Sequence, residues 1–162
     1  MLTSVKNVLS NFNKTVYFDT YHLLREKTRD TNIVQQCSEQ LIGFLKGSLN
    51  RQDEYFIKGA LGNLYRINGE TKKAIHYLTF CLQYARECQD TSKEIVSLIR
   101  LGEALKYSDD HQGALNNFNQ ALERSQSDNI ENYVDFVQQH KGKCLMEMTG
   151  FDEAESCFLE AF

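Results

Sequence analysis

The chain has 162 residues, 41% of them hydrophobic and 25% charged, which is the composition of an ordinary globular domain. A formal net charge of −4 argues against general nucleic-acid binding, because such binding needs a basic field over much of a surface. No apolar run approaches the length of a membrane span, so we expect neither a nucleic acid nor a membrane as partner. Proline is absent, which favours helices because nothing interrupts their hydrogen-bond ladder.

The N-terminal residues 1–52 predict helices. Residues 1–18 are amphipathic, which favours a first helix packed on its neighbours, with a transit peptide as the alternative. Two further helices are expected over residues 19–29 and 32–49. The second of them carries an apolar stripe of Val34, Cys37, Leu41 and Phe44. We expect residues 1–52 to form either a degenerate repeat or a helical cap for the region that follows.

From residue 53 onwards, residue types recur with a period of 40. The glycine column is Gly62, Gly102 and Gly142. Five further columns keep the same spacing: Ala74, Ala114 and Ala154; Leu78, Phe118 and Phe158; Leu82, Leu122 and Phe162; Tyr65, Leu105 and Leu145; and Cys81, Ala121 and Ala161. A period of this length indicates stacked helical units. The fold class we predict is all-α, a right-handed superhelical solenoid of antiparallel helix hairpins.

Residues 53–162 predict three such hairpins. The first has helices over about residues 53–67 and 71–87, with a turn at Asn68-Gly69. The second has helices over about 92–107 and 111–124, and the third over 130–148 and from 152 onwards. The third unit is incomplete, because its second helix is shorter than that of the first. Thr91 followed by Glu94 fits a capping box, and Asp128 followed by Glu131 resembles one.

The repeated glycine predicts a close crossing of two helices. A glycine inside a helix costs about 1 kcal/mol relative to alanine. A side chain at Gly62 would push the paired backbones apart, so closer packing of neighbours such as Ala74 and Leu78 offsets this cost.

These spacings resemble the tetratricopeptide repeat. Residues 58–78, KGALGNLYRINGETKKAIHYL, carry the pattern, and residues 98–118, LIRLGEALKYSDDHQGALNNF, match it again. Residues 138–158 form a looser copy, and the tryptophan and late proline of the pattern are missing. The 40-residue period and the triplet Leu61-Gly62-Asn63 resemble a longer-helix subclass, which includes Leu-Gly-Asn-repeat polarity adaptors and bacterial Rap-type peptide-sensing regulators. The resemblance implies a module that binds short peptide segments of partner proteins.

No pattern of an active site or a metal site occurs in the sequence. There is no nucleophile elbow, P-loop or His-Glu-x-x-His motif, and the five cysteines include no Cys-x-x-Cys pair. We therefore expect no enzyme activity and no cofactor. The cysteines are expected to be small buried hydrophobes in a reducing, cytoplasmic setting, and the proline-free composition leans towards a bacterial source.

The predicted binding surface is the concave groove, which the first helices of the hairpins line in this repeat class. The peptide-binding candidates are residues that the repeat register leaves out of internal packing: Phe56, Asn63, Arg66, Ile99, Arg100, Glu103, Lys106, Tyr107, His140 and Lys143. Met146 faces the groove by the same register. The basic members would form a strip for an acidic peptide, and the apolar members would anchor it. The alternative is that these charges are simply solvated, or that Lys106 pairs with Asp109 and Asp110.

The last hairpin predicts a second surface. Phe158, Leu159 and Phe162 have little to cover them, so either the chain is a fragment or this end binds a second copy in a homodimer. The main hypothesis is a non-catalytic scaffold or adaptor that binds a protein or peptide segment. Self-association through the last hairpin is the first alternative, and a regulatory subunit that acts on a partner enzyme is the second.

Overall fold

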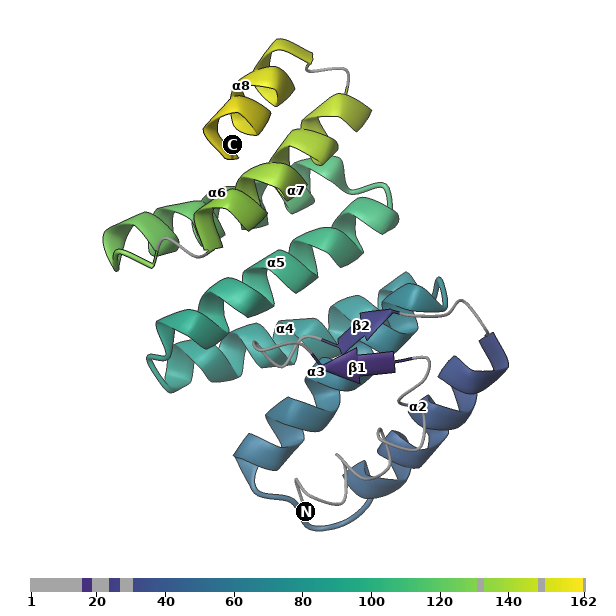
Figure 1. Cartoon of the computed structure of the whole chain (residues 1–162). Helices are drawn as coiled ribbons and strands as arrows, with labels where there is room; N and C mark the ends of the chain where they lie inside the picture. Colours follow the sequence, from purple (N-terminus) through teal and green to yellow (C-terminus); the bar gives the residue numbers. More distant parts are fainter. Residues whose placement is uncertain (1–15, 19–23, 27–30, 131–132, 149–150, 162) are drawn as a thin grey trace. The chain divides into compact units, whose positions relative to one another are not determined.

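The computed structural model describes residues 16–18, 24–26, 31–130, 133–148 and 151–161 (Figure 1). The chain divides into two compact units, Met1–Cys81 and Leu82–Phe162.

The first described element of the first unit is a short antiparallel pair of strands. Strand β1 (Val16–Phe18) pairs with β2 (Leu24–Glu26), and Tyr17 lies opposite Arg25. The predicted helices over residues 1–18 and 19–29 are therefore wrong at residues 16–18 and 24–26. The β-branched and aromatic run of β1 favours an extended strand, and pairing with β2 satisfies its backbone groups. The amphipathic stretch before β1 lies outside the described residues.

Helix α2 (Thr31–Leu45) follows the pair of strands and ends earlier than the expected residue 49. Its predicted apolar stripe is largely confirmed, because Val34, Cys37 and Leu41 are at most 1% exposed. Backbone hydrogen bonds from Lys46 and Gly47 to carbonyls three residues back tighten and close its last turn.

Helices α3 (Arg51–Ile67) and α4 (Thr71–Glu87) occupy the two segments predicted for the first hairpin. Asn50 caps α3, since its side chain accepts a hydrogen bond of 2.8 Å from the backbone N–H of Asp53. Gly69, with φ of 79°, lies in the left-handed region between the two helices, where glycine has no steric penalty.

The second unit holds α5 (Thr91–Tyr107), α6 (His111–Ser127), α7 (Val134–Glu147) and α8 (Phe151–Ala161). Within this unit α5 packs on α6, α7 packs on α8, and α7 also lies against both α5 and α6 (Figure 1). All four helices lie within a few residues of the predicted segments. The structure therefore confirms an all-α fold of helical hairpins in the repeat region.

The helix caps differ from the predicted ones. Asp90, not Thr91, caps α5, and its side chain accepts a hydrogen bond of 3.0 Å from the backbone N–H of Lys93. The Thr91 hydroxyl instead donates to Asp128, at 2.6 Å. Asp128 stands at the C-terminal end of α6, and Glu131 lies outside the described residues.

The helix ends share one turn geometry. The residue two positions after each of α3, α4, α5 and α6 has a positive φ: Gly69, Gln89, Asp109 and Asn129. The backbone N–H of the following residue donates to a carbonyl five residues back, for example from Asp110 to Leu105 at 3.0 Å. This is the Schellman motif, which satisfies carbonyls that the helix end leaves without partners.

Each repeated glycine faces a large apolar side chain 16 residues further along the chain. A Cβ atom on Gly62 would lie 2.5 Å from Cγ of Leu78. On Gly102 it would lie 2.6 Å from Cε1 of Phe118, and on Gly142 it would lie 2.7 Å from Cε1 of Phe158. The predicted close crossing is confirmed in all three hairpins.

Candidate interaction surfaces

Four of the ten predicted peptide-binding residues are buried. The exposed fraction is 9% for Phe56, 2% for Asn63, 1% for Ile99 and 4% for Arg100. We expected these four side chains to be exposed in the groove and to take no part in internal packing. This expectation is wrong, because the first helix of a hairpin is covered on more than one face. In α5, every residue from 95 to 102 is buried. A helix buried all round has no free face to offer a ligand.

Three more predicted residues tie α7 to the α5–α6 hairpin. Nδ1 of His140 lies 3.3 Å from a carboxylate oxygen of Glu103. The ammonium of Lys106 lies 3.2 Å from Glu147, so its partner is not the acidic turn at Asp109 and Asp110. These two contacts hold α7 on α5 within the second unit.

Glu147 is the centre of this contact. Its second carboxylate oxygen lies 3.0 Å from Nε2 of His111 at the start of α6. Partial burial alone would raise the pKa of the Glu147 carboxyl, but hydrogen bonds from His111 and Lys106 outweigh it, and the pKa is lowered. The carboxylate is therefore held in its charged form.

The contacts of α7 fall on one helical stripe, which we call the docking stripe: His140, Cys144 and Glu147. The His140 ring lies 5.8 Å from the Phe118 ring, between centroids. Cys144 donates its S–H to the carbonyl oxygen of His111, at 3.5 Å. Positions i, i+4 and i+7 share one face of a helix, so a single face of α7 seats it on α5 and α6.

Three predicted peptide-binding residues keep accessible surface. Tyr107 is 59% exposed at the end of α5, and Lys143 is exposed on α7. Arg66 is half-buried in the first unit. The predicted basic strip does not form in the second unit, because Arg100 is buried and Lys106 is paired with Glu147.

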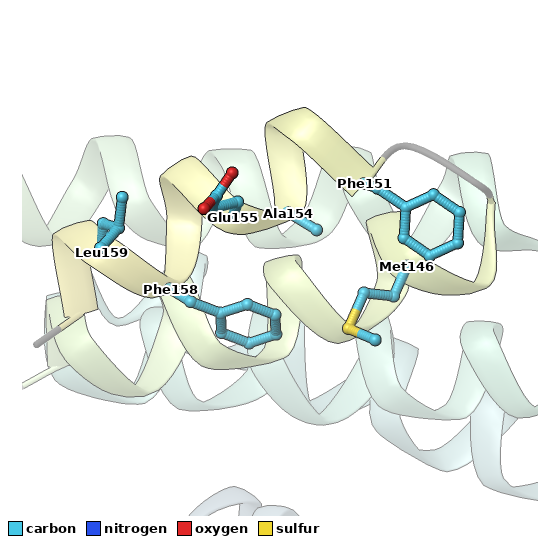
Figure 2. A pocket seen from close by; sticks show the side chains of 6 residues that line it. All are labelled: Met146, Phe151, Ala154, Glu155, Phe158 and Leu159. Carbon is cyan, nitrogen blue, oxygen red and sulfur yellow. The ribbon is translucent and has the colours of Figure 1, made fainter.

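The α7–α8 hairpin presents an apolar hollow of about 400 Å³, which we call the α7–α8 surface. It is lined by Met146, Phe151, Ala154, Glu155, Phe158 and Leu159. Figure 2 shows Met146 and Phe151 close together at one end and Leu159 at the other. The exposed fraction is 46% for Met146, 63% for Phe151 and 73% for Leu159.

This surface joins residues from both predicted sets. Phe158 and Leu159 come from the self-association set, whose third member Phe162 lies outside the described residues. Lys143 from the peptide-binding set lies on α7 one turn before Met146, which lines the hollow. Phe151 and Glu155 were missed. A comparison with His111 and Leu115, 40 residues earlier, would have revealed that their chemistry had changed.

Residues 55–127 match a tetratricopeptide repeat model. The match covers most of α3 and all of α4, α5 and α6, so it supports this family for the repeats; α7 and α8, the looser third copy, lie beyond it. No curated protein matches the chain. Tetratricopeptide repeats generally mediate contacts between proteins, and they are generally not catalytic.

The thiols of the helical hairpins are mostly packed inside. Cys81, Cys144 and Cys157 are buried, whereas Cys88 is exposed, contrary to expectation. Burial raises the pKa of the Cys144 and Cys157 thiols, and it raises the pKa of Cys37 in α2 to about 12. These three thiols stay protonated at neutral pH, so they are poor nucleophiles.

The described residues show neither a metal-binding cluster nor a helix that could cross a membrane. They contain no group of three or more His, Cys, Asp or Glu side chains that could hold a metal ion. Among the described helices, none combines the length and the apolar character that a membrane crossing needs.

Proposed function

We propose that this chain is a non-catalytic protein-binding module of the tetratricopeptide type that captures a segment of a partner on the α7–α8 surface. One observation carries the proposal. The described residues include five exposed large apolar side chains, and four of them, Met146, Met148, Phe151 and Leu159, belong to α7, α8 or the end of α7. A concentration of apolar side chains on one surface marks a binding site in a folded protein.

The predicted concave groove is the second candidate. Tyr107 and Lys143 are its most accessible members, and they support an apolar anchor and a cation for an acidic peptide. Residues such as Ile99 and Arg100 are buried and would shape this groove without touching the ligand. Peptide sensing of the Rap type, or an adaptor role of the Leu-Gly-Asn type, would use this side of the repeats.

Self-association and regulation of a partner enzyme are the remaining alternatives. We place the module in the cytoplasm, because its cysteines are unpaired and mostly buried, as suits a reducing compartment.

Affinity capture with surface variants tests the proposal. We expect Met146→Glu and Leu159→Glu to lower partner capture about tenfold each, since a carboxylate cannot enter an apolar interface without losing its hydration. Both side chains are exposed, so the helical circular-dichroism signal and the melting temperature should not change. Capture would be quantified by mass spectrometry from the source cells.

A matched control is Asn119→Glu, which places the same charge on α6 at the position equivalent to Leu159, one repeat earlier. It should leave capture unchanged. If all three variants capture the same proteins equally well, the α7–α8 surface is not the binding site. A loss of capture with Tyr107→Ala alone would move the function to the concave groove.

A further inference from the structure

The α7–α8 hairpin is the next copy of the α5–α6 hairpin. The surface of α5 and α6 on which α7 lies, which we call the seat, therefore has a counterpart one repeat later. That counterpart is the α7–α8 surface. With the period of 40, the pairs of equivalent residues are Glu103 and Lys143, Lys106 and Met146, His111 and Phe151, Ala114 and Ala154, and Phe118 and Phe158.

The aromatic part of the seat is kept in both copies, whereas Leu115, which packs against the core cluster that contains Leu145 of α7, has the carboxylate Glu155 as its counterpart. Phe118, against which the His140 ring lies, is replaced by another phenylalanine, Phe158. The glycine that receives each ring is kept as well, at Gly102 and Gly142. The backbone geometry that seats α7 on α5 and α6 is thus repeated on α7 and α8.

The polar part of the seat is reversed. Glu103 binds the imidazole of His140, and its counterpart Lys143 is a cation. Lys106 and His111 together bind the carboxylate of Glu147, and both of their counterparts, Met146 and Phe151, are apolar. A helix with the docking stripe of α7 would bring a weak base to Lys143 and a carboxylate to an apolar site.

We propose that the α7–α8 surface binds an amphipathic helix of a partner protein, seated as α7 is seated on α5 and α6, with an acidic residue at Lys143 and an apolar residue seven positions later at Met146 and Phe151. The inference rests on the proposed function of this surface and adds the class of ligand and its orientation. Position i+4 of the ligand corresponds to Cys144, so it carries a small side chain.

The charge of α8 favours a partner protein over a second copy of this chain. Asp152, Glu153, Glu155 and Glu160 are all exposed on α8, and the helix holds no lysine or arginine. A symmetric contact through two copies of α8 would bring eight carboxylates together, four from each helix. Like charges at close range disfavour such a contact.

The probes are peptides built on α7 itself, because α7 is the helix that fits the equivalent seat. Each spans residues 133–148 and carries Gly142→Ala and Cys144→Ala, which raise helix propensity and prevent oxidation. The acidic-apolar peptide adds His140→Glu and Glu147→Leu. The basic-apolar peptide adds His140→Lys and Glu147→Leu, and the acidic-acidic peptide adds His140→Glu alone.

Binding of labelled peptides to the 162-residue chain would be followed by fluorescence anisotropy. The acidic-apolar peptide should bind best. The acidic-acidic peptide should bind about tenfold more weakly, since Leu buries apolar area that Glu cannot. The basic-apolar peptide should bind about fivefold more weakly, which is the size of a change from an attractive to a repulsive pair at a partly exposed site.

A charge reversal on the protein sharpens the test. In Lys143→Glu the preference should reverse, and the basic-apolar peptide should bind better than the acidic-apolar one. Lys141→Glu, the same change two residues away on a different face of α7, should leave the preference unchanged. Only a direct contact between Lys143 and position i of the ligand produces this reversal.

Other outcomes separate failure of the inference from failure of the proposed function. If both apolar peptides bind but Lys143→Glu does not change their order, the proposed orientation is wrong while the surface still binds helices. If no peptide binds and Met146→Glu still abolishes partner capture, the ligand is not such a helix. If no peptide binds and capture is also unaffected, both proposals fail. A dimer in sedimentation velocity that Met146→Glu dissociates would make a second copy the occupant and overturn the inference.

Discussion

The α5–α6 and α7–α8 hairpins repeat one backbone with two different surfaces. Both place a glycine against a phenylalanine, Gly102 on Phe118 and Gly142 on Phe158. On α5–α6 Lys106 and His111 bind Glu147 of α7, whereas their counterparts on α7–α8, Met146 and Phe151, are apolar and exposed. The repeat positions therefore specify the hairpin, while the residues that differ between copies specify the surface that each hairpin presents.

Replacement of the phenylalanine by alanine should destabilise the chain by different amounts in the two hairpins. We expect Phe118→Ala to lower the free energy of unfolding by about 4 kcal/mol, because the side chain is fully buried and leaves a cavity. Phe158→Ala should cost about 2 kcal/mol, because Phe158 is only partly buried. Urea denaturation would measure both, and equal losses would mean that the two rings are equally packed.

Replacement of the repeated glycine by alanine should also destabilise the α5–α6 hairpin more than the α7–α8 hairpin, with smaller losses in the free energy of unfolding. Gly102→Ala should destabilise by about 2 kcal/mol, because the Phe118 ring that it meets has no room to move. Gly142→Ala should cost less than about 1 kcal/mol, since Phe158 can shift towards solvent and alanine favours the helix. A melting curve for each variant measures this, and a stabilised Gly102→Ala would contradict the close crossing.

The left-handed turn residues allow a comparison between the turns themselves. Gln89 has φ of 53°, and its replacement by glycine should stabilise the chain by about 0.5 kcal/mol. Asn129→Gly should gain less, because asparagine tolerates this conformation better. Gly69→Ala should have the opposite sign and cost about 1 kcal/mol. Chemical denaturation would rank the three variants.

Loss of the ion pairs of Glu147 should give the smallest change in the free energy of unfolding. Glu147→Gln should destabilise by about 0.5 kcal/mol at neutral pH, since the carboxylate is half exposed and solvent screens it. The pKa of Glu147 is lowered in the folded chain, so its contribution is complete above the ordinary glutamate value of 4.5 and is lost as the pH falls below it. Wild type and variant should therefore converge in stability at acid pH, and a constant difference would exclude this origin. Glu123→Gln on the exposed side of α6 is the control.

The repeat region was predictable because its signals are local and periodic. The glycine column and the turn residues placed α3 to α8 within a few residues. The caps were less accurate, because Thr91 and Asp90 are both good capping residues and only the observed hydrogen bond distinguishes them. The pair of strands was missed, since a three-residue strand such as β1 is too short to show an alternating pattern.

The candidate sites were harder to predict because exposure depends on neighbours far away in the sequence. A helical wheel assigns one buried and one free face to α5, but this helix is covered on both, which removed Ile99 and Arg100 from the accessible surface. The pairing of Lys106 with Glu147 joins residues 41 positions apart, and no local pattern reveals it. Leu159 was predicted correctly as exposed, whereas Phe151 would have required a comparison between copies.

The shared turn geometry has a consequence for how such a chain can change in length. Helices α3, α4, α5 and α6 each have 17 residues, and their left-handed turn residues follow one another at intervals of 20. Deletion of one residue inside any of these helices would rotate every later side chain of that helix by about 100°. The length of each helix is therefore constrained by the repeat, and the natural cassette for insertion, exchange or engineering is one hairpin of two helices with their turns.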